Sequence, residues 1–205
     1  MLLTRREWLI LVVNAAYVSI FSVITVRRLN FEFMLYVGVI LLVGALVVWK
    51  QRTVGFDGVI LWGLTLWGMM HLAGGNITVG DGVLYGVEFV SLVPNYQVIR
   101  YDQVVHLLGF GVATLVCHHL LRPHLKEHVD HWGTLSFLIV LMGCGFGALN
   151  EIIEFLAVAV MPETGVGGYE NTMLDLVFNL IGAALAVAWL AVRRSAREPS
   201  SQTVT

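Results

Sequence analysis

The chain contains 205 residues, of which 58% are hydrophobic and 13% are charged, and its mean hydropathy is +0.80. Because soluble domains carry roughly a quarter charged residues, this composition predicts an integral protein of the lipid bilayer. The net charge of −2, with no run of Lys or Arg, argues against a surface for nucleic acid. The two cysteines, Cys117 and Cys144, form no Cys-x-x-Cys pair, so neither a disulfide framework nor a thiolate metal site is expected.

Six segments are long and apolar enough to cross the hydrocarbon core, which takes about 20 residues per helix. They are Trp8–Val26, Phe33–Trp49, Val54–Leu72, Gln103–Leu121, Thr134–Val160 and Thr172–Val192. The sequence therefore predicts an all-α fold, a six-helix transmembrane bundle. We expect a single domain over residues 1–192 and a disordered cytoplasmic tail over residues 193–205, which is short and polar.

The positive charges predict the orientation of the bundle, since Lys and Arg accumulate in cytoplasmic loops. Nine of the twelve fall on the side that holds both termini and the second and fourth loops. The other side has Arg27, Arg28 and Arg100. Both termini are therefore predicted to be cytoplasmic.

This orientation places ionisable residues from four spans at one level, just below the outer surface. They are His71 in the third span, Asp102 and His106 in the fourth, Glu151 and Glu154 in the fifth, and Asp175 in the sixth. A charged side chain at the centre of a membrane helix costs about 2.5–3.5 kcal/mol even on lenient insertion scales, so this set needs a compensating environment.

Helical spacing brings the same residues onto shared faces, because positions three or four apart are neighbours on a helix. Each face continues into small residues that let helices pack closely. The stripes are Asp102, His106, Gly109 and Ala113; Gly143, Gly147, Glu151 and Glu154; and Asp175, Asn179, Gly182 and Ala186. We expect these helices to enclose one polar pocket.

Crowded carboxylates require either protons or a cation as neutraliser. The metal interpretation has Asp102, His106, Glu151 and Asp175 holding one divalent ion, with Zn²⁺, Mn²⁺ and Mg²⁺ all compatible. Glu154 or His71 would then act as general acid or base. Asn150 and Asn179 line the pocket, and Glu170 and Asn171 follow a glycine-containing loop that covers it.

Each of these residues also has a purely structural explanation. Asp102 and Asp175 lie in first turns, where an aspartate favours the helix dipole or caps the helix. His71 and His106 can be interior histidines with satisfied hydrogen bonds. A structural role explains Glu151 and Glu154 less well, because Ser or Asn would join two membrane helices at lower cost.

At these residues the sequence resembles the YjdF-like family of bacterial inner-membrane proteins. The matching pieces are His71-Leu-Ala-Gly-Gly75, Tyr101-Asp102-Gln103-x-x-His106, Asn150-Glu151-x-x-Glu154 and Gly167-Gly-Tyr-Glu-Asn-Thr-x-x-Asp175-x-x-x-Asn179-x-x-Gly182. More remotely the chain looks like VanZ-like proteins. The resemblance implies a multi-pass protein of the bacterial cell membrane and supplies no reaction.

Three hypotheses follow for function. The first is a metal-dependent enzyme on a lipid or lipid-linked envelope substrate in the outer leaflet, with a metal-bound water as nucleophile. The second is a small proton- or cation-coupled transporter that uses the same carboxylates. Few polar residues in the inner halves of the spans argue against it. The third is a structural or regulatory membrane protein without chemistry.

Overall fold

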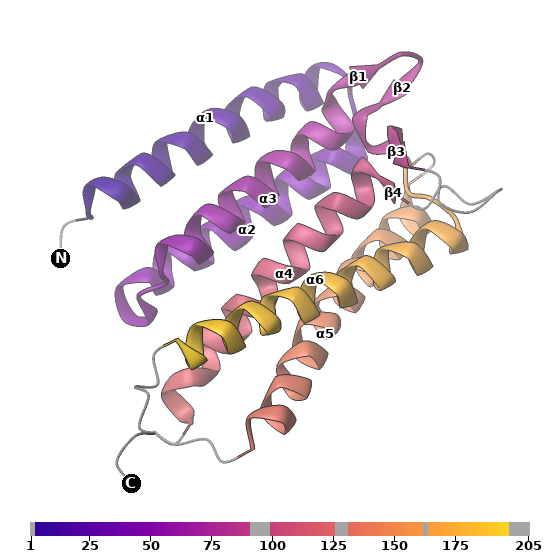
Figure 1. The fold of residues 1–205 in the computed structure, drawn as a ribbon. Helices are drawn as coiled ribbons and strands as arrows, with labels where there is room; N and C mark the ends of the chain where they lie inside the picture. Colours follow the sequence, from indigo (N-terminus) through magenta and orange to yellow (C-terminus); the bar gives the residue numbers. More distant parts are fainter. Residues whose placement is uncertain (1–2, 91–98, 126–130, 162–163, 197–205) are drawn as a thin grey trace, which may run out of the picture.

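The fold is a bundle of six long helices in a computed structural model, which describes residues 3–90, 99–125, 131–161 and 164–196 (Figure 1). The helices are α1 (Arg5–Arg27), α2 (Phe31–Val54), α3 (Gly58–Asn76), α4 (Tyr101–Leu121), α5 (Trp132–Val160) and α6 (Tyr169–Ser195). Within the described ranges all six are long and apolar enough to cross a membrane. The predicted all-α, six-span fold is confirmed.

The third span differs from its predicted bounds of Val54–Leu72, and local capping explains the shift. Gly55 ends α2 in the left-handed region, with φ of 64°, which glycine adopts without steric cost. The Asp57 side chain then accepts a hydrogen bond from the backbone of Ile60 and starts α3. Helix α3 therefore starts later than predicted; it also extends past the predicted end at Leu72 to Asn76, so His71 lies more than one turn inside its end.

The ends of α1 and α6 agree with the same local rules. The Thr4 side chain and Glu7 form a reciprocal capping box at the start of α1. Helix α6 continues to Ser195, three residues into the segment predicted as a tail. The rest of that predicted tail, residues 197–205, lies outside the described residues.

The connection from α3 to α4 contains short strands that the sequence patterns did not predict. Strands β1 (Thr78–Val79) and β2 (Gly82–Val83) pair antiparallel, as do β3 (Glu88–Val90) and β4 (Ile99–Arg100). A 3-10 turn, η1 (Leu84–Gly86), lies between the two pairs. These strands and the α1–α2 and α5–α6 connections share one end of the bundle, which we call the hairpin end (Figure 1). Helix α1 begins and α6 ends at the opposite end of the bundle. The distribution of Lys and Arg predicts that this opposite end faces the cytoplasm.

Helices α4 and α6 make the most extensive helix–helix contact in the bundle. Their backbones meet where Gly111 of α4 faces Gly182 of α6. A Cβ atom at Gly182 would stand 2.1 Å from the carbonyl oxygen of Leu107, so no larger residue fits. Gly182 belongs to the predicted small-residue stripe of the sixth span, but Gly111 does not belong to that of the fourth: the predicted Gly109 faces the ring of Trp67 on α3 instead.

We expect Gly182→Ala to destabilise the protein by about 1–3 kcal/mol, because the added methyl group forces α4 and α6 apart. Thermal unfolding in detergent measures the change. Gly145→Ala is the matched control, since a Cβ there meets nothing within 4 Å; it should unfold at the same temperature or slightly higher. Equal unfolding temperatures for Gly182→Ala and wild type would show that the close approach is not needed.

Candidate functional site: a buried carboxylate and histidine cluster

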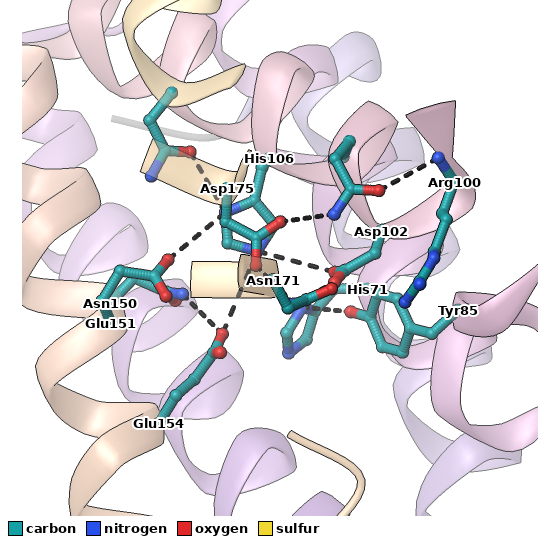
Figure 2. Close-up of polar contacts among 12 residues, drawn as sticks. His71, Tyr85, Arg100, Asp102, His106, Asn150, Glu151, Glu154, Asn171 and Asp175 are labelled. Atoms are coloured by element: carbon teal, nitrogen blue, oxygen red, sulfur yellow. Dashed lines mark hydrogen bonds and ion pairs between the residues drawn. The ribbon is translucent and has the colours of Figure 1, made fainter. Parts of the chain in front are cut away.

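Five of the predicted ionisable residues converge near the hairpin end, between α4, α5 and α6 (Figure 2). Two groups of side chains each bring their ligand atoms within 4.8 Å of one another. The groups are Asp102, His106 and Asp175, and His106, Glu151 and Glu154. We call the five residues the polar cluster. The sequence prediction that these spans share one pocket therefore agrees with the geometry.

His106 is common to both groups and lies at the centre of the polar cluster. Its Nδ1 is 3.1 Å from the side-chain oxygen of Asn179, which can only accept a hydrogen bond. That contact assigns the proton to Nδ1 in the neutral imidazole. The Nε2 lone pair then faces Asp102, with Oδ1 at 3.6 Å, and Glu154, with Oε1 at 4.0 Å.

Amide side chains donate hydrogen bonds to the two aspartates that α4 and α6 contribute to the polar cluster. Asn171 donates from Nδ2 to Asp175 at 2.6 Å and to Asp102 at 3.0 Å, bridging the two carboxylates. Gln103 donates to the other oxygen of Asp175 at 2.8 Å and accepts from the backbone of Arg100 at 3.0 Å. Both aspartates act only as acceptors here, as ionised carboxylates do.

The two glutamates that α5 contributes to the polar cluster receive fewer hydrogen bonds than the aspartates. Glu154 accepts a hydrogen bond from Asn150 at 2.7 Å. Glu151 is 9% exposed, and neither of its oxygens has a hydrogen-bond partner within the described residues. Its Oε1 is 3.6 Å from His106 Nδ1, beyond hydrogen-bond range, and the Asn150 amide nearby is directed to Glu154. Glu151 therefore presents to the cluster a carboxylate that no hydrogen bond from the described residues satisfies.

His71 lies beside the polar cluster and outside both groups of possible ligands. Its Nδ1 is 2.6 Å from the hydroxyl of Tyr85, a residue of the η1 turn (Figure 2). Aromatic rings surround its imidazole, with centroids 5.1–6.2 Å away; they belong to Phe33, Tyr36, Trp67 and Tyr85. This aromatic box fixes the ring of His71 in one orientation.

Glycines of the predicted motifs make room for the aromatic box. A Cβ at Gly74 would stand 2.7 Å from the ring of Tyr85, and one at Gly109 would stand 2.4 Å from the ring of Trp67. The His-Leu-Ala-Gly-Gly motif is therefore explained by packing around His71. Tyr85 itself lies in an apolar loop, so no pattern in the sequence indicated its role.

The remaining predicted site residues divide into contacting and exposed ones. Asn150, Asn171 and Asn179 all contact the polar cluster, as described above. Glu170 is exposed in the first turn of α6 and points to no role in the site. Gln103 was not among the predicted residues, although it is fully buried against Asp175. Its contact with Asp175 could not be predicted, because helical spacing relates residues within one helix and this contact joins two different spans.

The loop between α5 and α6 is tied to α2 near the cluster. The buried carboxylate of Glu32 accepts a hydrogen bond from the backbone nitrogen of Gly165 at 2.6 Å. Glu32 lies just before the predicted second span, Phe33–Trp49, but α2 begins at Phe31 and includes it. This contact joins the described part of the α5–α6 connection to α2.

Comparisons with known proteins identify relatives without a known reaction. A family model described as "Predicted membrane protein (DUF2238)" matches residues 7–196. An uncharacterised protein of Thermotoga maritima is 29% identical over 87 residues, which make up 42% of this chain and 45% of that protein. The chain thus matches less than half the length of this relative. The comparison with solved structures gives no significant match.

We expect Asn171→Ala to lower stability by about 1–3 kcal/mol, because Asp102 and Asp175 then lose their shared donor. Thermal unfolding again provides the measurement. The matched control is Glu170→Gln at the neighbouring exposed position, which should stay within about 0.5 kcal/mol of wild type. Equal effects of the two substitutions would contradict the bridging role of Asn171.

Proposed function

The chain belongs to the DUF2238 family of predicted membrane proteins, and we propose that its polar cluster binds a divalent metal ion and forms the active site of a membrane enzyme. The substrate class that fits is a lipid or a lipid-linked envelope molecule. This proposal places the protein in the bacterial cell membrane with both termini in the cytoplasm, so that the cluster faces the outer leaflet.

The observation that carries the proposal is the unpaired carboxylate of Glu151. A buried charge without a partner is strongly unfavourable, and the surrounding Asp102, Glu154 and Asp175 add like charges. His106 alone cannot neutralise them, because an imidazole carries at most one positive charge against four carboxylates. A divalent cation would offset two of these negative charges and use the free oxygens of Glu151.

The distances between the side chains support this interpretation. Metal–ligand bonds of 2.0–2.2 Å in tetrahedral geometry hold neighbouring ligand atoms about 3.4 Å apart. His106 Nε2 is 3.6 Å from Asp102 Oδ1 and 4.0 Å from Glu154 Oε1, distances too long for hydrogen bonds and close to that spacing. Glu151 joins His106 and Glu154 in a group whose ligand atoms lie within 4.8 Å of one another. His106 Nε2, Asp102 and Glu154 are the proposed ligands, with Glu151 and Asp175 completing the set.

The hydrogen bond of His106 to Asn179 suits a metal ligand as well. A ligating histidine usually donates its other ring N–H to an acceptor, which fixes its tautomer and orientation. Zn²⁺, Mn²⁺ and Mg²⁺ all accept a set of carboxylates with one imidazole. Such an ion would supply a nucleophile by lowering the pKa of bound water to about 7. In this proposal Glu154 acts as a ligand instead of the acid or base first expected.

His71 is the proposed hydrogen-bond donor to the substrate, and Tyr85 positions it. Burial, with the nearby negative charges of Asp102 and Glu154, raises the pKa of Tyr85 above its usual value, so its hydroxyl stays protonated. A hydroxyl that donates to Nδ1 places the proton of the neutral imidazole on Nε2. That N–H can donate a hydrogen bond to a polar group of the substrate at the edge of the polar cluster, as a neutral histidine does when it polarises a carbonyl.

The position of the cluster selects a lipid substrate. The cluster lies near one end of the spans, at the depth where lipid headgroups meet the hydrocarbon core. Asp102 and Glu154 keep 20% and 13% of their side-chain surface exposed, so the site is reachable from that end. A substrate with an apolar tail in the bilayer and a polar head at the interface can reach the cluster laterally.

We expect purified wild-type protein to contain stoichiometric divalent metal, measured by plasma mass spectrometry after purification without chelators. Glu151→Gln and His106→Ala should lose the metal while remaining folded in detergent. Glu88→Gln is the control, because this carboxylate is exposed and lies outside the cluster. Wild-type protein without metal, even after addition of Zn²⁺, Mn²⁺ and Mg²⁺, would overturn the proposal and favour a protonated carboxylate site in a transporter.

We expect Tyr85→Phe and His71→Gln to keep the metal and lose activity, since neither residue belongs to the proposed ligands. Mass spectrometry of membrane lipids can report the activity, because cells with the wild-type protein should differ from cells with Glu151→Gln in at least one lipid species. Both substitutions should reproduce the Glu151→Gln lipid profile with the metal still bound. Loss of the metal in His71→Gln would instead assign His71 to the ligands.

A further inference from the structure

A cleft of about 540 Å³ opens between α1, α2 and α3, on the side of the bundle away from the polar cluster. Its walls are mostly aliphatic and include Leu11, Val18, Val47 and Leu64. Cavities of 300–1,000 Å³ are typical ligand sites. Figure 1 shows α1 diverging from α3 toward the end where the chain begins, which is where the cleft lies.

From these walls we infer that the cleft binds one acyl chain of an anionic phospholipid in the leaflet at the end where the chain begins. This site is separate from the polar cluster and does not rest on the function proposed above. Protein interiors are packed closely, so an apolar cleft of this size within a bilayer is filled by hydrocarbon.

The length of the cleft fits a single leaflet. Its wall on α1 extends from Glu7 to Ser19, which is about 18 Å at 1.5 Å per residue. Half of a hydrocarbon core of about 30 Å is close to that length. One chain that enters at the bundle end therefore reaches the bottom of the cleft at Trp67 and Gly68, near the middle of the membrane.

The polar side chains on the walls do not call for a polar ligand, because they bond one another. Asn14 donates to Thr65 at 2.8 Å, and Tyr17 donates to Asn14 at 2.7 Å. At the open end Gln51 donates to Glu7 at 2.8 Å. These internal hydrogen bonds leave an apolar surface for an occupant.

The charges at the open end select an anionic headgroup. Exposed basic residues flank it from both helices; they are Arg5 and Arg6 at the start of α1, and Lys50 and Arg52 at the end of α2. Each such residue near a membrane surface contributes about 1 kcal/mol of attraction to anionic lipid. A phosphate at this level would lie among them while its chain occupies the cleft.

Photolabelling of the full-length protein tests this inference. The protein is placed in phosphatidylethanolamine and phosphatidylglycerol vesicles with a trace of phosphatidylglycerol that carries a mid-chain diazirine. Peptide mass spectrometry should find severalfold more label on Leu11, Val47 and Leu64 of the cleft than on Val12 and Leu42, which are exposed on the same helices. A phosphatidylcholine probe with the same chain should label the cleft less.

Matched substitutions separate the cleft from the general lipid surface. Ala15→Trp and Gly44→Trp fill the cleft from opposite walls and should remove the excess label. The controls are Ala16→Trp, one position from Ala15, and Gly38→Trp, six positions from Gly44. Neither residue lines the cleft, so both variants should keep the excess label. Two independent walls keep the test valid if one variant fails to fold, which thermal unfolding would reveal.

Two results would overturn the inference. Uniform label over cleft and exposed positions would mean that only general bilayer lipid contacts these helices. Equal labelling by the phosphatidylglycerol and phosphatidylcholine probes would exclude selection of an anionic headgroup. Metal content, measured on the same samples, reports separately on the polar cluster, so failure of one proposal is distinguishable from failure of the other.

Discussion

The close backbone approach of α4 and α6 is the constraint on which the site depends. Gly111 and Gly182 let the two helices meet without intervening side chains. One and two turns toward the hairpin end, the same two helices bring Asn179 to His106 and Asp175 to Gln103. These cross-helix hydrogen bonds need distances near 3 Å, so a wider helix separation would remove both. The close packing of the small residues therefore also sets the positions of the polar groups.

The polar cluster is built asymmetrically, and the asymmetry carries the chemical interpretation. The aspartates on α4 and α6 accept hydrogen bonds from Asn171 and Gln103, so their charges are stabilised by the protein itself. Glu151 on α5 has no such donor within the described residues. A structural polar contact between membrane helices would leave no oxygen unpaired, because the loss in free energy is largest in a low-dielectric environment. This unpaired side is the basis of the proposal that a metal ion binds here.

Much of the fold could be predicted from the sequence because the bilayer imposes the length and apolarity of each span. The site could be predicted in part because Asp102, His106, Glu151, Glu154 and Asp175 stand out as charges in apolar helices. Helical spacing then placed them on packing faces that the structure brings together. The prediction failed for the bounds of the third span, which is Gly58–Asn76 instead of Val54–Leu72. Its later start comes from the local cap at Asp57, which the hydrophobic pattern does not reveal.

Residues that act through contacts between distant segments could not be predicted. Tyr85 lies 14 positions from His71 in an apolar loop, and its hydroxyl gains meaning only when the η1 turn packs on α3. Gln103 similarly acts on Asp175, 72 residues away. Periodicity describes one helix at a time and gives no information on rotation of one helix about another. Pairing across helices required the structure.

Aromatic residues lie between the apolar cleft and the polar cluster. Trp67 lines the cleft between α1 and α2 on one side and contacts the ring of His71 on the other. Tyr36 and Phe33 also contact the ring of His71. Carboxylates need polar partners and acyl chains need none, so the two environments cannot share a continuous space. Because Gly74 and Gly109 allow the rings of Tyr85 and Trp67 to pack directly against helix backbone, these aromatic residues fit between the cleft and the polar cluster within one bundle.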